Sequence, residues 1–240
     1  MTDNFSRLFF ENQTFMHPEL SDETGLVGVS FELHYEDLLA AYRFGIFPVN
    51  DPGDPIGWWS PDPRWILDPL EVKISKSMKK FIRDSTWKIT CDQDFEKVMR
   101  LCGEGRKRKD QHPSWITEEV IAEYYRFYDS GRGHSFEVRD ESNDIIGGFY
   151  GIVTGNIFAG ESMFANKPNA SKYAFIIACG FLSSIGIKTI DCQMHSYHLE
   201  SLGAYPVERL VYLELIKRNG FEISELIGNW SERFDTYLNK

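Results

Sequence analysis

The stretch Gly147–Gln193 decides the fold of this protein. It consists of three blocks: GGFYGIVTGNIFAGESMF (147–164), NKPNASKYAFIIACGFLSSIG (166–186) and IKTIDCQ (187–193). In the first block, Gly155-Asn156 separates two β-prone runs, which predicts a two-residue hairpin. The second block predicts a helix that begins after Asn169 and ends at Gly186. Because the third block is a short β-branched run, the whole stretch is expected to fold as hairpin, helix and strand.

Three polar residues lie on these otherwise apolar strands, and each needs a partner or a task. Glu161 lies inside the predicted strand 157–164, while Asp191 and Gln193 lie near the end of the strand 188–193. Residues two apart on a strand share a face, so Asp191 and Gln193 can act together. A purely structural interpretation is also open. In it, Glu161 is a buried carboxylate in an ion pair, and Asp191 and Gln193 at the strand end cap the next turn.

The segments around this stretch predict an α+β sandwich. Thr117-Glu118-Glu119 opens a helix that runs to Gly131. The other predicted elements are antiparallel strands at 134–139, 145–153 and 157–164, a helical turn at 199–202, and a helix from Pro206 to Arg218. An antiparallel meander followed by helix, strand and helix is typical of acyltransferase folds.

The first part of the chain predicts a separate small unit. Residues 35–44 have helical spacing and stop at Gly45, after which a proline- and glycine-rich loop follows. Prolines continue to Pro69, so a domain boundary is predicted near Asp68. The chain is therefore expected to contain a small N-terminal α/β domain (1–68) and a larger domain (69–240).

Composition places the protein among globular proteins of the cytoplasm. With 42% hydrophobic and 15% aromatic residues, the 240-residue chain can bury a core. No run approaches the roughly 20 apolar residues of a membrane span, and the N-terminus lacks a signal-peptide pattern. The four cysteines form no CxxC pair and predict reduced thiols, at Cys91, Cys102, Cys179 and Cys192.

Two basic clusters stand out in an acidic chain. The net charge of −10 argues against a protein whose whole surface binds nucleic acid, but it allows a local basic patch. A helix over 73–83 would carry a basic stripe on one face, made of Lys76, Lys79, Lys80 and Arg83. A second cluster, at 106–109, is expected in a polar loop. Each cluster is either a solvated face or a contact for a polyanion, and the pair favours a polyanionic partner.

Nine segments, in the same order along the chain, resemble the leucyl/phenylalanyl-tRNA–protein transferases. They are LLAAYRFGIFP (38–48), PGDPIGWWSPDPR (52–64), ISKSMKKF (74–81), WIT (115–117), GGFYG (147–151), GESMF (160–164), NASK (169–172), IDCQ (190–193) and HLESLGA (198–204). The resemblance implies a C-terminal domain with an N-acetyltransferase-like (GNAT) fold and a mainly antiparallel sheet flanked by helices. It also implies transfer of Leu or Phe from aminoacyl-tRNA to the N-terminal amine of proteins that begin with Arg or Lys, which marks them for degradation.

Aminoacyl transfer to an amine is aminolysis of an activated ester, so no cofactor and no metal are expected. The α-amine has a pKa of about 8 and must lose a proton during the reaction. By resemblance, Asp191 and Gln193 are the catalytic pair. A glutamine cannot serve as a true base, so Asp191 is expected to orient Gln193, whose carbonyl aligns the amine. Glu161 is expected to receive the cationic N-terminus of the acceptor protein.

The resemblance also implies an aminoacyl pocket and a tRNA contact. The pocket is expected to contain Trp115, Phe149, Phe158 and Phe175, because an aromatic slot favours Leu or Phe over polar side chains. The basic helix with Lys76, Lys79, Lys80 and Arg83 matches the region that contacts tRNA phosphates. Expected partners are thus aminoacyl-tRNA and proteins with basic N-termini, with no membrane partner, and the chain is expected to be a monomer.

Three departures from the family pattern leave the preferred donor and acceptor open. Val49 stands where a tryptophan usually follows GIFP, and Ala178 stands at a helix position that is often aromatic, although Phe175 can refill that volume. Residues 28–33 read GVSFEL in place of a GGDLS-like segment. The same reaction with a different donor or acceptor is therefore an alternative.

Two other functions fit the sequence less well. A CoA-dependent N-acetyltransferase needs a basic, glycine-rich loop before a helix, whereas residues 164–171 read FANKPNAS, with a proline and no glycine. A non-enzymatic RNA-binding module would leave the polar residues of the strands without a task. A metal site at Asp191, Cys192, His195 and His198 is conceivable on spacing alone, but adjacent strand residues point to opposite faces.

Overall fold

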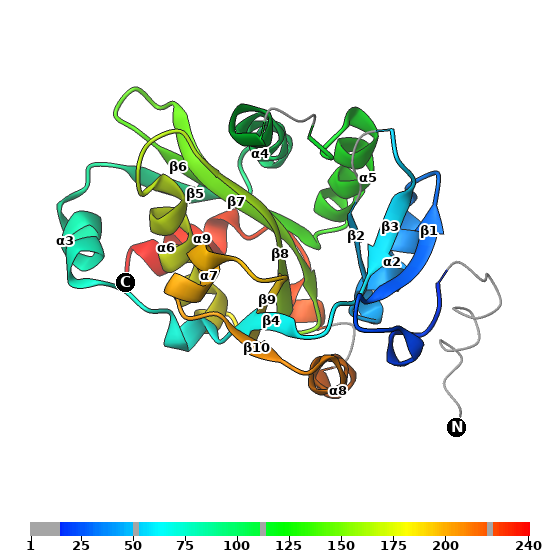
Figure 1. Ribbon diagram of the computed structural model, residues 1–240. Helices are drawn as coiled ribbons and strands as arrows, with labels where there is room; N and C mark the ends of the chain where they lie inside the picture. Colours follow the sequence, from blue (N-terminus) through cyan, green and yellow to red (C-terminus); the bar gives the residue numbers. More distant parts are fainter. Residues whose placement is uncertain (1–14, 50–52, 111–113, 220–222) are drawn as a thin grey trace.

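The computed structural model describes residues 15–49, 53–110, 114–219 and 223–240, and of residues 105–110, 219 and 224 it describes the backbone only. A three-stranded antiparallel sheet lies near the N-terminus (Figure 1). Its order is β1 (Leu26–Ser30), β3 (Ile56–Trp59) and β2 (Phe47–Val49). Helix α2 (Tyr35–Arg43) connects β1 to β2 and ends before Gly45, whose φ of +69° suits a glycine.

A seven-stranded sheet forms the body of the molecule. In spatial order its strands are β10 (Tyr205–Val207), β4 (Arg64–Leu67), β9 (Thr189–Gln193), β8 (Ile157–Ala165), β7 (Ile145–Thr154), β6 (Gly133–Arg139) and β5 (Lys88–Cys91). All neighbouring pairs are antiparallel except β8 and β9, which run parallel. The hairpin of β7 and β8 turns at Gly155-Asn156, as predicted.

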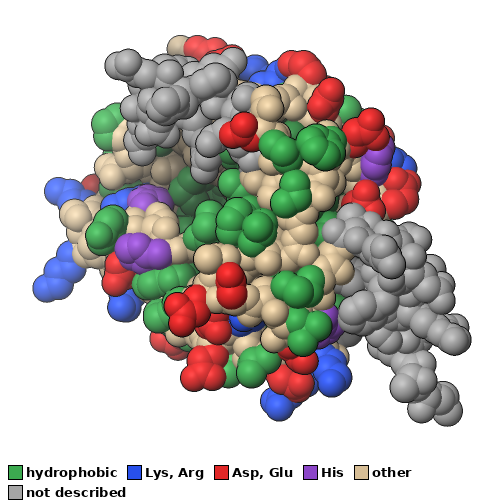
Figure 2. Space-filling view, turned by 45° about the vertical axis from the view of Figure 1, so that its right-hand side comes forward, with side chains coloured by type: hydrophobic (Ala, Val, Ile, Leu, Met, Phe, Trp, Pro, Cys, Tyr) green, Lys and Arg blue, Asp and Glu red, His purple; other side chains and the backbone are tan. Residues whose placement is uncertain are grey.

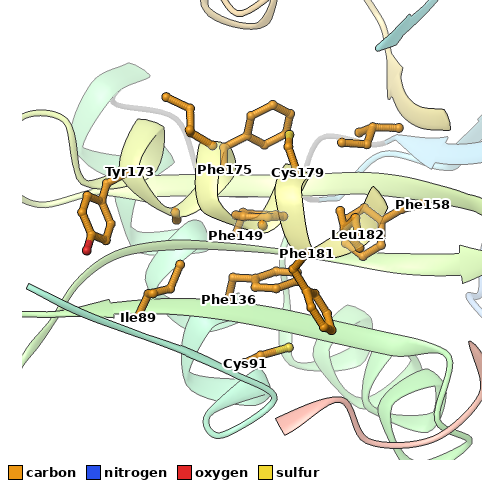
Figure 3. Packing of buried hydrophobic residues seen from close by; sticks show 14 of the residues in the cluster. Ile89, Cys91, Phe136, Phe149, Phe158, Tyr173, Phe175, Cys179, Phe181 and Leu182 are labelled. Carbon is orange, nitrogen blue, oxygen red and sulfur yellow. The ribbon is translucent and has the colours of Figure 1, made fainter. Parts of the chain in front are cut away.

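Helices cover both faces of this sheet (Figure 1). One face packs against α6 (Ala170–Ser184) and α9 (Ser231–Leu238), and Figure 3 shows aromatic rings of β6, β7 and α6 between these layers. The other face packs against α4 (Phe95–Asp110) and α5 (Glu118–Asp129). The remaining helical segments are η1 (Pro18–Leu20), η2 (Pro69–Glu71), α3 (Lys76–Asp84), α7 (Tyr197–Ser201), α8 (Arg209–Asn219) and η3 (Ser224–Leu226).

The α+β class is confirmed, as is the mainly antiparallel, helix-flanked sheet expected of a GNAT-like domain. The predicted helix after Asn169 is also confirmed. Asn169 precedes α6 with a left-handed φ of +72° and makes no side-chain cap. In α5, by contrast, the Thr117 hydroxyl accepts a hydrogen bond from the backbone N–H of Val120.

Two sequence predictions are wrong. Pro206 does not begin a helix: it lies in the edge strand β10, opposite Trp65 of β4, and the helix begins at Arg209. An edge strand can hold a proline because its missing N–H is not needed on the solvent side. The basic cluster 106–109 is not in a loop either, because its backbone continues α4 to Asp110. Arg and Lys, which make up this cluster, have good helix propensity. The polar composition of the segment nevertheless suggested a loop.

The N-terminal unit shares its core with the larger unit. One hydrophobic cluster joins Trp58 and Leu38 of the first with Tyr124 of α5 and Tyr150 of β7. Strand β4, which precedes the predicted boundary at Asp68, belongs to the seven-stranded sheet. The division at residue 68 therefore stays a prediction. Over the described ranges, no helix has the length and apolar character needed to cross a membrane.

Candidate active site

A cavity opens where the two parallel strands stop pairing. Strands β8 and β9 pair only from Ile157 opposite Thr189 to Ala159 opposite Asp191. Beyond that point a cavity of about 830 Å³ lies between them, lined by residues 160–165 of β8 and 190–193 of β9. The start of α6 and the segment 194–199 complete its wall. The separation of the strands thus places Glu161, Asp191 and Gln193 around one space.

The Asp191 carboxylate is held by four hydrogen bonds. Arg64 donates from Nε to Oδ1 (2.8 Å) and from a terminal nitrogen to Oδ2 (2.6 Å). The Tyr212 hydroxyl donates to Oδ2 (2.7 Å), and the backbone N–H of Gln193 donates to Oδ1 (2.9 Å). Arg64 and Asp191 are both 1% exposed. Because each oxygen already accepts two donors, this carboxylate serves as a fixed anchor.

Arg64 connects this anchor to the N-terminal unit. Its second terminal nitrogen donates to the backbone carbonyl of Gly45 (2.9 Å). Its guanidinium also lies between the rings of Phe47 and Tyr212, at 4.6 and 4.5 Å from their centroids. Burial alone would lower the pKa of Arg64, but the charge of Asp191 raises it above the usual value. Arg64 therefore stays charged although it is buried.

Gln193 departs from the strand geometry that the sequence suggested. Its φ of +63° is left-handed, so regular alternation ends there and the same-face argument does not hold. The backbone N–H of Gln193 is bonded to Asp191, as described above. The Gln193 side chain donates from Nε2 to Oε1 of Glu161 at 2.9 Å. Its carbonyl oxygen Oε1 is then the group that can accept a hydrogen bond from a substrate.

Glu161 ends a chain of buried hydroxyl groups. The Tyr124 hydroxyl donates to its Oε2 at 3.1 Å, and the hydroxyls of Tyr124 and Tyr42 are 2.8 Å apart. Burial raises the pKa of Glu161 from 4.5 to about 7, against the opposing effect of these hydroxyl groups. The carboxyl can therefore change its charge near neutral pH.

The four expected aromatic residues do not share one location. Phe149 and Phe175 line the cavity, with ring centroids 5.7 Å apart. Phe158 is fully buried behind them, near Trp230 at 6.4 Å between centroids. Trp115 is buried in the core that the N-terminal unit shares with α4 and α5. Neither Phe158 nor Trp115 is among the described residues of the cavity wall.

The basic stripe lies on the exposed side of α3. Lys76, Lys79, Lys80 and Arg83 are exposed, whereas Met78 on the opposite side is buried in the core. Arg83 forms an ion pair with Asp84 at 2.8 Å, so three lysines remain as the main positive charges. Figure 1 shows α3 at the end of the molecule opposite the three-stranded sheet.

The described residues contain no group of three or more His, Cys, Asp or Glu side chains with the geometry of a metal site. Asp191 is bonded to Arg64, and His195 is bonded to Glu200 at 2.9 Å. The four cysteines all lie in the described part of the chain, where they are buried and form no disulfide.

Sequence reasoning missed four residues that hold the site: Arg64, Tyr212, Tyr42 and Tyr124. Arg64 and Tyr42 lie inside the segments 52–64 and 38–48 that resemble the family, and this position could have indicated them. Tyr212 and Tyr124 lie on the buried faces of helices α8 and α5, where an aromatic residue ordinarily indicates only packing.

The fold and the site together define the chemical class. A fixed carboxylate, an amide and a carboxyl of raised pKa converge on a partly apolar cavity in an α+β domain. These groups can align an amine, accept its proton and bind an apolar acyl group, which are the requirements of an acyltransferase.

Comparison with known proteins narrows this class to a family. The family sequence model described as leucyl/phenylalanyl-tRNA protein transferase matches residues 66–217, and the model of its N-terminal domain matches residues 31–62. The chain is 42% identical over 216 residues to the leucyl/phenylalanyl-tRNA–protein transferase of Anaeromyxobacter dehalogenans strain 2CP-C, covering 90% of this chain and 91% of that protein. It is 41% identical over 220 residues to the transferase of Legionella pneumophila strain Corby, covering 92% and 97%. The chain belongs to the leucyl/phenylalanyl-tRNA–protein transferase family and is an aminoacyltransferase.

Two solved structures show weaker similarity to the chain. L-PGS from Bacillus licheniformis matches with a TM-score of 0.42 and 12% identity, over 82% of this chain and 73% of that one. A GCN5-related N-acetyltransferase from Kribbella flavida matches with a TM-score of 0.38 and 9% identity, over 70% and 58%.

Proposed function

We propose that the protein moves Leu or Phe from aminoacyl-tRNA to the N-terminal α-amine of proteins that begin with Arg or Lys, and so marks them for degradation. The observation that carries this proposal is the hydrogen bond between the side chains of Gln193 and Glu161 in the cavity wall. Asp191, in the same wall, accepts a hydrogen bond from the backbone N–H of Gln193. The family name supports the donor, and the acidic group at the cavity wall supports a cationic acceptor. A cytoplasmic location and a monomeric state remain predictions.

The proposed roles follow from the contacts. Asp191 is held by Arg64 and Tyr212, and it fixes the backbone of Gln193. The hydrogen bond to Glu161 then sets the direction of the side-chain carbonyl of Gln193. That carbonyl accepts a hydrogen bond from the attacking amine. The amine loses one proton as it attacks the ester, and Glu161, with its pKa near 7, is better suited to receive that proton than the fully bonded Asp191.

In this proposal Phe149 and Phe175 bind the apolar side chain of the donor. Both line the cavity, whereas Phe158 and Trp115 act from behind it by fixing the core. Ala178 is fully buried in α6 and belongs to the same core cluster as Phe175. Because an alanine leaves volume that a larger residue would fill, the donor preference of this protein can differ from that of its relatives. The same reaction with another donor is therefore the alternative.

One assay tests the reaction. Transfer is measured in single-turnover reactions for a matrix of donors (Leu-, Phe-, Met- and Ser-tRNA) and peptides that start with Arg, Lys, Met, Asp or Glu. We expect transfer of Leu or Phe to peptides with N-terminal Arg or Lys, and a rate at least about 100-fold lower for Gln193→Ala, which removes an aligning group. Phe31→Ala, at a residue 87% exposed on the N-terminal unit, is the control. Transfer to acidic N-termini alone, or an unchanged rate for Gln193→Ala, would contradict the proposal.

A further inference from the structure

Three aromatic rings form a row at the mouth of the cavity, and the transfer reaction as proposed does not use them. The ring of His195 lies 4.6 Å from the ring of Trp65 and 4.7 Å from the ring of Tyr197, between centroids. His195, the middle ring of the row, belongs to the cavity wall, whereas Trp65 packs against the core and Tyr197 lies on the outer side. The bond from His195 Nε2 to Glu200 fixes its ring.

The outer end of this row is unusually exposed for aromatic and apolar residues. Tyr197 is 83% exposed and Met194 is 49% exposed. Figure 2 shows hydrophobic side chains gathered around a hollow on one face of the molecule, with histidine side chains at its edge. Tyr197 meets the ring of His195 edge to face, at an interplanar angle of 81°. A largely exposed aromatic ring next to a substrate cavity is suited to stacking.

The row also lies on the way from the cavity to the basic stripe of α3. Helix α7, which begins with Tyr197, is followed by Leu202, whose carbonyl accepts a hydrogen bond from the backbone N–H of Lys73 at 2.8 Å. Lys73 lies three residues before α3 begins. Figure 1 shows α7 on the side of β9 that faces α3. A chain that leaves the cavity over α7 therefore approaches the three exposed lysines, Lys76, Lys79 and Lys80.

We infer that Trp65, His195 and Tyr197 form a stacking platform for the unpaired nucleotides that precede the terminal adenosine of the donor tRNA. This inference rests on the proposed function, because it takes aminoacyl-tRNA as the donor. Single-stranded nucleic acid is recognised by exposed aromatic faces beside basic groups, and stacking tolerates any base. The terminal aminoacyl group enters the cavity, the preceding bases lie on the platform, and the phosphates continue toward α3.

The acceptor protein is the other macromolecule that could lie on this surface. An acceptor with a basic N-terminus would need acidic partners. Among the nearby carboxylates, Glu200 is already bonded to His195, and Glu161 lies in the cavity wall. The continuity of the platform with the lysines of α3 favours a polyanion instead. The two occupants give opposite results in the following experiment.

The experiment measures binding of uncharged tRNA, first with its complete 3′ end and then shortened by its last three nucleotides. Tyr197→Ala is expected to weaken binding of the complete tRNA by about 5- to 150-fold, the size of one base–aromatic stack. Binding of the shortened tRNA is expected to be the same for the variant and the wild type. Tyr197→Phe keeps the ring and is expected to bind within about twofold of the wild type, because stacking needs no hydroxyl.

Kinetics supply the second measurement. Tyr197→Ala is expected to raise the KM for aminoacyl-tRNA and to leave the KM for the acceptor peptide unchanged, while Phe31→Ala, equally exposed but distant, changes neither. An increased KM for the peptide alone would assign the platform to the acceptor and overturn the inference. Equal loss of complete and shortened tRNA would also overturn it. If the wild type binds tRNA but transfers no amino acid, the proposed function fails while the platform result still stands.

Discussion

At the scale of single residues, the charge of Glu161 is the property most open to test. Its carboxyl accepts hydrogen bonds from Gln193 and Tyr124, yet burial raises its pKa to about 7. Below that pH it is neutral, and above it the carboxylate attracts a cationic amine. The residue can therefore bind the acceptor and take up its proton within the same narrow range of pH.

The pH dependence of acceptor use follows from this pKa. For the wild type, we expect kcat/KM for the acceptor peptide to rise with pH in a step near 7. A second rise near about pH 8 reports the α-amine of the peptide itself. Glu161→Gln should remove the step near 7 and retain the second one, while the affinity for aminoacyl-tRNA changes little. If donor affinity and acceptor use fall equally, Glu161 does not act on the acceptor.

The same group makes stability depend on pH. The folded protein retains the proton of Glu161 up to about pH 7, whereas an unfolded chain releases it near 4.5. The free energy of unfolding should therefore fall as the pH rises from 4.5 toward 7, and Glu161→Gln should reduce that fall.

The ion pair of Arg64 and Asp191 is the second feature at this scale. Arg64→Met leaves a buried carboxylate without its cation and is expected to lower the free energy of unfolding by about 3–5 kcal/mol. Adding Asp191→Asn should restore part of that loss, because the unpaired charge is removed, but should not restore transfer. Urea denaturation measures both effects. Arg126→Met is the matched control: its ion pair with Glu36 (2.6 Å) is exposed, so the loss should stay below about 1 kcal/mol. Equal losses for Arg64→Met and the control would show that the buried pair has no special role.

At the scale of elements, the close approach of β7 and β8 positions the site. Gly151 lies opposite Gly160, next to a register shift in this strand pair. A Cβ atom on Gly151 would lie 2.2 Å from the carbonyl oxygen of Ala159. Any larger residue would therefore displace the backbone of β8 just before Glu161. The path of β8 at this point places Glu161 2.9 Å from the side-chain nitrogen of Gln193.

A pair of alanine substitutions tests this packing. Gly151→Ala should destabilise the protein by about 1–3 kcal/mol, because the added methyl group has no room against backbone atoms. Gly160→Ala, in the partner strand, should be nearly neutral for stability, since its Cβ would meet no atom closer than 3.8 Å. Thermal unfolding compares the two variants. Similar melting temperatures for both would mean that the backbone can shift at Gly151 without cost.

At the scale of the whole molecule, an acidic protein is expected to bind a polyanion through one local surface. The net charge of −10 would repel tRNA, and we expect the exposed lysines of α3 to supply a local attraction. We expect the logarithm of the tRNA-binding constant to fall linearly with the logarithm of the salt concentration. The double substitution Lys79→Glu and Lys80→Glu should weaken binding and reduce the slope by about 1.4–1.8, since each of the two phosphate contacts contributes about 0.7–0.9. Lys217→Glu on α8, at a lysine whose side chain is 80% exposed, is the control. An unchanged slope for the α3 variant would place the tRNA elsewhere.

The sequence by itself determined the class of fold, most of the elements and the family. Local patterns suffice for these features: Gly155-Asn156 defines a hairpin, Thr117 caps a helix, and ordered motifs identify relatives. Glu161, Asp191 and Gln193 could be selected because polar residues on apolar strands require an explanation. Pro206 was misinterpreted because an edge strand is defined by its neighbour β4, which lies about 140 residues earlier.

Only the tertiary structure decided how the site is held and which residues reach it. Arg64 binds Asp191 across 127 positions of sequence, and Tyr124 binds Glu161 across 37, so no local pattern could pair them. The same holds for the aromatic residues, since Phe149 and Phe175 reach the cavity while Trp115 and Phe158 lie in the cores behind it. The physical reason is that burial, charge pairing and the pKa of Glu161 depend on which distant segments pack together. These contacts exist because β8 and β9 stop pairing before the site and the N-terminal unit shares a core with the larger unit.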